Sequence, residues 1–314
     1  MCAIFGLIDY SHHFTTKQRE KILRVLSTAC EARGRDATGF ACAHKGILDI
    51  RKLNVPASQF NWHIPNHCNI IMGHTRMTTQ GDAARNYNNH PFRGEVANAT
   101  FAFAHNGVIQ NDSHLRKSYD LPPTVIETDS YVAVQLLEHI GELSYSSLAQ
   151  MAELLYGTFT FTLLDNNNNF YFVKGENPLA LYHFENEGFY IYASTKSILL
   201  SALQQMHLVN LEYNIIDLQP GDILCINARG KFTASTFNAY QEDDSLFFQD
   251  IDDEYFSLIE YAEYYSVDFN YIEILLEWGY QYEEIIELIR NPLYLENVVT
   301  QILYGDCEVN TLTF

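Results

Sequence analysis

Hydrophobic and polar residues follow two different patterns along the chain, and the pattern changes near residue 238. Before that point, short apolar runs rich in β-branched and aromatic residues are separated by polar turns, which is typical of β-strands. Beyond it, Ile, Leu, Tyr and Glu recur at helical spacing. The pattern predicts a mixed domain over 1–238, followed over 239–314 by an acidic linker and a helical module that is broken at Gly279.

Within the first region the pattern predicts about ten strands and helices near 16–33, 128–140 and 195–204. The first strand, 2–8, is apolar throughout, so it is expected to be buried. The stretch ANATFAFAHNGVIQN, residues 97–111, predicts a strand, a tight Asn-Gly turn and a second short strand.

A long polar loop, TTQGDAARNYNNHPFRG, follows the strand predicted within CNIIMGHTRM. Loops of this length inside a compact domain are more often functional than idle. The sequence therefore marks residues 78–94 as a candidate part of a functional site.

Charge narrows the range of partners. The chain has 19 Lys and Arg against 39 Asp and Glu, a net charge of −20. Binding to nucleic acid depends on clustered basic side chains, and anionic membrane surfaces also attract basic rather than acidic proteins. We therefore expect neither nucleic acid nor membrane as a partner.

Location is constrained by three features of the sequence. The first residues lack the basic and apolar pattern of a signal peptide, and no uncharged apolar stretch approaches the roughly 20 residues that a membrane helix needs. The six cysteines are scattered without a CxxC pair. Together these features predict a cytoplasmic protein with reduced thiols.

Cys2 is the first candidate for chemistry, and the residue alone leaves open a small hydrophobe, half of a disulfide or a nucleophile. If Met1 is removed, Cys2 carries a thiol and a free α-amine, with reference pKa values of about 8.5 and about 8. The amine can accept the thiol proton directly or through one water, so no histidine partner is required. The scattered cysteines disfavour the disulfide.

Motifs elsewhere in the chain strengthen the nucleophile interpretation. In order along the sequence they are MCAIFG, RGRDATGFA (33–41), GHTRMTTQG (73–81), NNHPF (88–92), AHNGVIQN (104–111) and ETDSYV (127–132). This series resembles the class II glutamine amidotransferase domain, an N-terminal-nucleophile (Ntn) hydrolase. The most similar pattern is that of the glutaminase domain of glucosamine-6-phosphate synthase, and the resemblance covers residues 2–238.

The resemblance implies an α+β fold, the four-layer αββα Ntn-hydrolase sandwich. It implies hydrolysis of glutamine to glutamate and ammonia through a γ-glutamyl thioester on Cys2. Asn106, through its side-chain amide, and Gly107, through its backbone N–H, match the family's oxyanion donors. Without the resemblance, the same two residues would be interpreted as a plain hairpin turn.

The resemblance also implies the residues that bind substrate. Arg76 would pair with the α-carboxylate of glutamine in the bidentate geometry that a guanidinium allows. Asp129 would bind the α-ammonium group, although it also suits the N-terminus of a helix. Thr79 and His90 lie in the polar loop, which would close as a lid over glutamine. Arg33 would orient the chain terminus or its amine.

Three positions depart from the family pattern. Ala3 stands where glycine is usual, Arg35 replaces a common tyrosine, and Met77 stands where the family often has Trp or Tyr. The aromatic residue helps to gate ammonia passage in those enzymes, so Met77 puts such coupling in question. No nucleotide motif is present, and no cofactor or metal is expected; His63, His67 and Cys68 lie in a loop without a fourth ligand.

Three functions are compatible with the sequence. The chain is an enzyme that releases ammonia from L-glutamine for an acceptor on a separate synthase subunit, or it is a stand-alone hydrolase of γ-glutamyl amides or peptides. The third possibility is a catalytically silent interaction module. The intact set of predicted catalytic and binding residues argues against the third.

Overall fold

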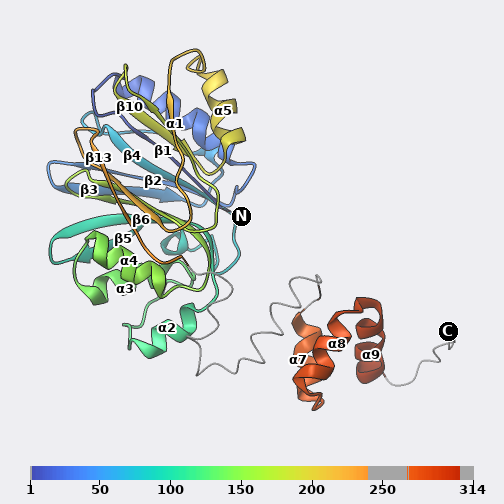
Figure 1. Cartoon of the computed structure of the whole chain (residues 1–314). Coiled ribbons are helices and arrows are strands. Elements are labelled where there is room, and N and C mark those ends of the chain that lie inside the picture. Colours follow the sequence, from blue (N-terminus) through green and yellow to red (C-terminus); the bar gives the residue numbers. More distant parts are fainter. Residues whose placement is uncertain (1, 240–266, 268, 305–314) are drawn as a thin grey trace. The chain divides into compact units, whose positions relative to one another are not determined.

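The computed structural model describes residues 2–239, 267 and 269–304 (Figure 1). The chain divides into two units, residues 1–240 and residues 241–314. Most of the predicted acidic linker falls in 240–266 and so lies outside the described residues. Across the described part of the chain, no helix combines the length and apolar character that crossing a bilayer requires.

The first unit is built on two antiparallel sheets. In spatial order, the seven-stranded sheet consists of β11 (Asn214–Ile216), β9 (Ala180–Phe184), β10 (Phe189–Ala193), β1 (Ala3–Ile8), β4 (Ile70–Arg76), β2 (Ala37–His44) and β3 (Ile47–Leu53). The six-stranded sheet consists of β13 (Phe232–Thr236), β12 (Asp222–Ile226), β8 (Phe170–Lys174), β7 (Gly157–Asp165), β6 (Ala99–Ile109) and β5 (Phe92–Val96). Every strand pairing is antiparallel.

Helices cover the outer face of each sheet (Figure 1). The helices are α1 (Thr16–Cys30) and α5 (Lys196–Gln205) on the seven-stranded sheet, and α3 (Tyr131–Ile140) and α4 (Tyr145–Glu153) on the six-stranded sheet, with a short α2 (Asp112–Ser118) after β6. Three apolar layers separate these elements, one between the sheets and one under each pair of helices. The predicted αββα sandwich is confirmed.

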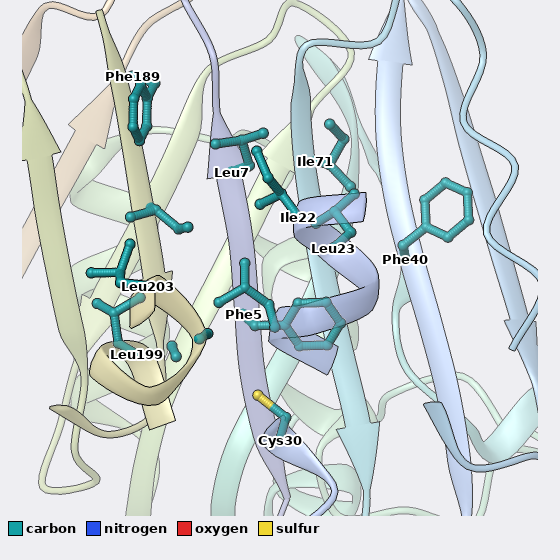
Figure 2. Close-up of a cluster of buried hydrophobic side chains, with 14 of the residues drawn as sticks. Phe5, Leu7, Ile22, Leu23, Cys30, Phe40, Ile71, Phe189, Leu199 and Leu203 are labelled. Carbon is teal, nitrogen blue, oxygen red and sulfur yellow. The ribbon is translucent and has the colours of Figure 1, made fainter. Parts of the chain in front are cut away.

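β1 fills two of these layers because its side chains alternate between the faces of the sheet. Ala3, Phe5 and Leu7 belong to the layer that faces α1 and α5 (Figure 2). Ile4 and Ile8 belong to the layer between the two sheets. All six residues of β1 are buried, which explains why its sequence shows no polar alternation.

α1 is fixed at its first turn by two interactions. The backbone N–H of Gln18 donates to Thr15 Oγ1 at 3.3 Å, and Gln18 Oε1 accepts from the Thr15 N–H at 2.8 Å. This capping box makes Thr15 the N-cap of α1. One turn into the helix, the guanidinium of Arg19 lies 3.1 Å from the carboxylate of Asp9, and both side chains are buried. The pair joins α1 to the end of β1.

The predicted turn at Asn106-Gly107 is wrong. β6 runs without a break from Ala99 to Ile109, and its residues 101–109 all pair with β7. An Asn-Gly hairpin would need the two halves of the segment to pair with each other, and β7 takes that place. Gly107 instead meets a steric requirement, since its φ is +150° and an added Cβ would lie 1.9 Å from the Thr158 carbonyl oxygen.

The second unit contains the helices α7 (Phe269–Glu277), α8 (Tyr282–Ile289) and α9 (Pro292–Tyr304). The predicted break at Gly279 is present, and this glycine adopts a left-handed φ of +88° that ends α7. The apolar core of the second unit is formed by Ile272, Leu275, Ile285, Ile289, Leu295 and Val299.

The contact between Gly73 and Phe5 provides a test of the packing around β1. A Cβ added to Gly73 would lie 2.3 Å from the Phe5 ring, which is fully buried. Gly73→Ala should therefore lower the free energy of unfolding by about 1–3 kcal/mol, the usual cost of overpacking, as measured by chemical denaturation. Combining it with Phe5→Leu should cost less than the sum of the two single variants. An unchanged stability of Gly73→Ala would contradict this packing.

Candidate active site

The segments that carry the predicted site residues meet at one end of the first unit. The register of β1 with β4 pairs Ala3 with Thr75, so Cys2 lies beside the end of β4 at Arg76. The Cys2 thiol donates to the Met77 carbonyl oxygen at 3.5 Å. Asn106 of β6 reaches the same region through its contact with Arg33. Asp129, which lies just before α3, contacts the end of β6 at Ile109.

The environment of the Cys2 thiol keeps it protonated. Burial raises its pKa, while the contact with Met77 and the positive charge of Arg76 act in the opposite direction. Because the net shift is upward, the thiol needs a base to become a nucleophile at neutral pH.

Arg33 connects Cys2 to Asn106. Its Nε donates to the Cys2 carbonyl oxygen at 2.9 Å, and its Nη2 donates to Asn106 Oδ1 at 3.3 Å. A guanidinium carries only donors, so the amide oxygen of Asn106 must face it. The amide nitrogen of Asn106 is buried and, among the described residues, has no hydrogen-bond partner. The contact therefore leaves a buried donor available near the thiol.

Gly107 lies where β6 extends beyond its neighbour β5. β5 pairs with residues 99–103 of β6, whereas β7 pairs with residues 101–109. On the β5 side, the N–H of Ile109 donates to Asp129 Oδ2 at 2.7 Å. N–H groups two residues apart in a strand point to the same edge, so the Gly107 N–H is directed toward the edge that Asp129 occupies.

Asp129 is buried and does not cap α3. Its Oδ1 accepts from the Ser130 hydroxyl at 3.3 Å, in addition to the Ile109 contact. Ser130 occupies the N-cap position, and it forms no side-chain capping bond. The alternative interpretation of Asp129 as a helix cap is therefore not what the structure shows.

Arg76 is 3% exposed and holds the polar loop against the end of β4. Its guanidinium donates to Asn89 Oδ1 at 2.7 Å, to the Gln80 carbonyl at 2.6 Å and to the Gly81 carbonyl at 2.8 Å. All three acceptors are neutral, so these bonds leave the buried positive charge able to attract an anion.

The polar loop is also joined to the segment before α3. Arg85 forms an ion pair with Glu127, and Asn88 Nδ2 donates to Glu127 Oε2 at 2.8 Å. The Glu127 N–H donates back to Asn88 Oδ1 at 2.9 Å. Thr79 is exposed within this loop. The role of Glu127 was missed from the sequence because its partners lie about 40 residues away along the chain.

His90 lies in a row of buried imidazoles. Its ring centroid is 4.2 Å from that of His74 and 4.3 Å from that of Phe92, and among the described residues neither ring nitrogen has a hydrogen-bond partner. His74 Nε2 lies 3.0 Å from the His105 carbonyl oxygen, and His105 Nδ1 lies 2.8 Å from Ser130 Oγ. The structure thus places His90 against His74 and Phe92, inside the protein.

The three residues considered as metal ligands have different surroundings. His67 stacks on His44 with a centroid distance of 4.7 Å, His63 faces Glu20, and Cys68 is buried. Within the described residues, no group of His, Cys, Asp and Glu has an arrangement that fits a metal ion.

A hollow of about 590 Å³ opens elsewhere, and its lining includes Asp9, Arg19 and His44. Cys2 and Asp9 are at opposite ends of β1, about 23 Å apart at the usual rise per residue. None of the predicted site residues lines this hollow.

Comparison with known proteins identifies the class. A model of the glutamine amidotransferase domain matches residues 74–201. Glutamine–fructose-6-phosphate aminotransferase (isomerizing) of Staphylococcus aureus is 29% identical over 246 residues, which cover 73% of this chain and 38% of the relative. The Staphylococcus epidermidis protein of the same name is 30% identical over 222 residues, covering 65% and 34%. The chain thus spans little more than a third of the length of these relatives.

Two solved structures show the same fold. Glutamine phosphoribosylpyrophosphate amidotransferase of B. subtilis aligns with a TM-score of 0.59 at 18% identity, covering 76% of this chain and 50% of that one. An allosteric regulatory enzyme of purine biosynthesis aligns with a TM-score of 0.60 at 19% identity, with the same coverage.

The first unit therefore has the fold of the Ntn-hydrolase amidotransferases. The match over residues 74–201 and the similar relatives confirm that this part of the chain resembles the class II glutamine amidotransferase domain.

The buried histidines make stability depend on pH. Burial lowers the pKa of His74 to about 3 and also lowers the pKa of His90 and His105. The unfolded chain, with histidine pKa values of about 6.5, therefore binds more protons than the folded chain below that pH. The free energy of unfolding should fall as the pH falls from about 6.5 toward 3, by up to about 1.4 kcal/mol per pH unit for each histidine.

Chemical denaturation at several pH values measures this slope. His90→Phe should reduce the slope of the free energy of unfolding against pH by about 1.4 kcal/mol per pH unit, the contribution of one proton. The reason is that an apolar ring, which takes up no proton, replaces the imidazole. His63→Gln is the matched control, since His63 is 76% exposed and should leave the slope unchanged. Equal slopes for His90→Phe and the unmodified chain would contradict the prediction.

Proposed function

We propose that the first unit hydrolyses the side-chain amide of glutamine with Cys2 as nucleophile, after removal of Met1. The observation that carries the proposal is the bridge from the Cys2 carbonyl oxygen through Arg33 to Asn106, whose buried amide nitrogen has no hydrogen-bond partner among the described residues. The names of the relatives and of the matching family model support glutamine as the substrate.

The reaction uses the chain terminus as its proton carrier. The free α-amine of Cys2 takes the thiol proton, and the thiolate attacks the amide carbon of glutamine. The carbonyl oxygen becomes an oxyanion that accepts from Asn106 Nδ2 and the Gly107 N–H, each contributing on the order of 3 kcal/mol. The ammonium returns the proton to the leaving nitrogen, so ammonia departs and a γ-glutamyl thioester remains. Water then attacks the thioester, releasing glutamate and restoring the thiol.

The amino-acid end of glutamine would be held by two opposite charges. Arg76 would bind the α-carboxylate, since its neutral partners leave its charge available. Asp129 would bind the α-ammonium, with Ile109 and Ser130 fixing its orientation. Thr79 and the rest of the polar loop would close over the substrate, and His90 would support that loop from within. Arg33 would position Cys2 and Asn106.

For the ammonia we propose an acceptor on a separate synthase protein. Supporting this, residues 269–304 form a small helical unit whose described core has six residues, a size that suits docking better than a second catalytic site. A second candidate is a stand-alone hydrolase of γ-glutamyl amides. Met77 favours it, because this residue is half exposed where the similar enzymes often carry an aromatic gate.

Mass spectrometry tests the nucleophile. The purified chain should lack Met1, and incubation with a glutamine-derived diazoketone should add a single adduct on Cys2. Cys2→Ala should lose ammonia release and labelling while its unfolding midpoint stays close to that of the unmodified chain. Cys225→Ala is the matched control, since Cys225 is a free thiol in β12 and should not affect labelling. A chain that keeps Met1, or an adduct elsewhere, would contradict the mechanism.

Ammonia release measured with the isolated chain separates the two acceptor hypotheses. A stand-alone hydrolase should turn over glutamine or a γ-glutamyl amide at full rate without any other protein. A synthase subunit should hydrolyse glutamine slowly alone and faster when its acceptor enzyme and acceptor substrate are added. A full rate that no added protein changes would contradict the separate-acceptor proposal.

A further inference from the structure

Asn177 lies in the loop between β8 and β9, and its side chain contacts the predicted oxyanion-binding residues. Its Nδ2 donates to the Asn106 carbonyl oxygen at 2.7 Å and lies 3.4 Å from Thr158 Oγ1. The side chain is largely buried. Thus the backbone oxygen of the residue that carries one predicted oxyanion donor is bonded to a side chain from another part of the fold.

The bond to the Asn106 carbonyl also determines where the Gly107 N–H points. The Asn106 C=O and the Gly107 N–H belong to one planar trans peptide unit, in which they point in opposite directions. Asn177 lies on the β7 side, where its own backbone contacts β7. Holding the carbonyl toward β7 therefore holds the Gly107 N–H toward the opposite edge of β6, where Asp129 lies.

Asn177 is anchored independently of its side chain. Its N–H donates to the Phe159 carbonyl at 3.3 Å, and its carbonyl accepts from the Thr160 hydroxyl at 2.6 Å. Both partners belong to β7, the strand that also pairs with β6. A change confined to the side chain should therefore leave the loop in place and remove only the bond to Asn106.

The geometry at Gly107 leaves the peptide in need of such support. With its φ of +150°, Gly107 adopts a conformation that its lack of a Cβ permits, and glycine has more backbone freedom than other residues. β5 does not reach this part of β6, so no strand among the described residues holds the peptide from the open edge. β7 holds this stretch of β6 along its other edge, and the bond from Asn177 to the Asn106 carbonyl adds to that restraint.

We infer that Asn177 is a positioning residue that fixes the Asn106–Gly107 peptide so that the Gly107 N–H can stabilise the oxyanion. This inference rests on the proposed function, in which an oxyanion forms at Cys2. It predicts a role in the transition state rather than in glutamine binding, because the N–H is needed only after charge develops on the substrate oxygen.

Steady-state kinetics of glutamine hydrolysis by the full chain test this role. Asn177→Ala should lower kcat by about 10- to 100-fold, less than the 10²–10³-fold typical of losing an oxyanion donor outright. The KM for glutamine should stay within about twofold of that of the unmodified chain. Asn177→Asp has the same shape but places an acceptor oxygen against the Asn106 carbonyl, so its kcat should be at least as low.

Two comparisons separate positioning from general damage. Alkylation of Cys2 by iodoacetamide forms no oxyanion, so its rate should be the same in Asn177→Ala and in the unmodified chain. Asn111→Ala is the matched control: Asn111 is also buried, donates to the Leu154 carbonyl at 2.9 Å and accepts from the Tyr156 N–H at 2.9 Å. It should lose stability to a similar extent while keeping its kcat.

The outcomes distinguish this inference from the proposed function. If the unmodified chain hydrolyses glutamine through Cys2 but Asn177→Ala keeps its full kcat, the positioning role is wrong and the proposed function stands. Equal loss of kcat in Asn111→Ala, or slower alkylation of Cys2 in Asn177→Ala, also overturns the role. If the unmodified chain neither hydrolyses glutamine nor is labelled on Cys2, the proposed function itself fails.

Discussion

β1 is paired along both edges and buried on both faces, and the candidate site is arranged around Cys2, the residue that directly precedes this strand. Pairing with β4 brings Cys2 next to Arg76, and apolar layers on either side restrict movement of the strand. Close packing makes such a strand rigid, since even one added methyl group is felt. Cys2, the nucleophile that we propose, is therefore held in position by the core.

Several buried polar atoms of this site have no hydrogen-bond partner among the described residues: Asn106 Nδ2, both ring nitrogens of His90 and Thr128 Oγ1. Buried donors and acceptors normally have partners because an unpaired one costs free energy. The His105 and Asn106 carbonyls of β6 receive side-chain partners from His74 and Asn177. The Asn106 amide nitrogen, in contrast, has none among the described residues. An unpaired buried donor is a cost that a ligand oxygen would remove, and Arg33 links this one to Cys2, which is why it carries weight in the proposal.

Much of the fold was predictable from the sequence because its signals are local. The apolar runs indicated the strands, a helix was expected near residues 16–33 where α1 lies, and Gly279 marked the end of α7. The Asn106-Gly107 turn was predicted wrongly because a strand partner from a distant segment overrode the local turn preference. Glu127 and Asn177 were missed for a related reason. Their importance lies in partners that only the folded chain brings near them, and no spacing within the sequence encodes those contacts.

The candidate site contains a buried positive charge although the chain as a whole is strongly negative. This contrast bears on the kind of ligand that the site could bind. A chain with a net charge of −20 repels anions over most of its surface. At the end of β4, however, the buried charge of Arg76 is solvated by an amide and two backbone carbonyls rather than by carboxylates. Asp129 lies in the same region with its oxygens oriented by Ile109 and Ser130. A ligand that satisfies both must carry an anionic and a cationic group close together, which is the pattern of a free α-amino acid.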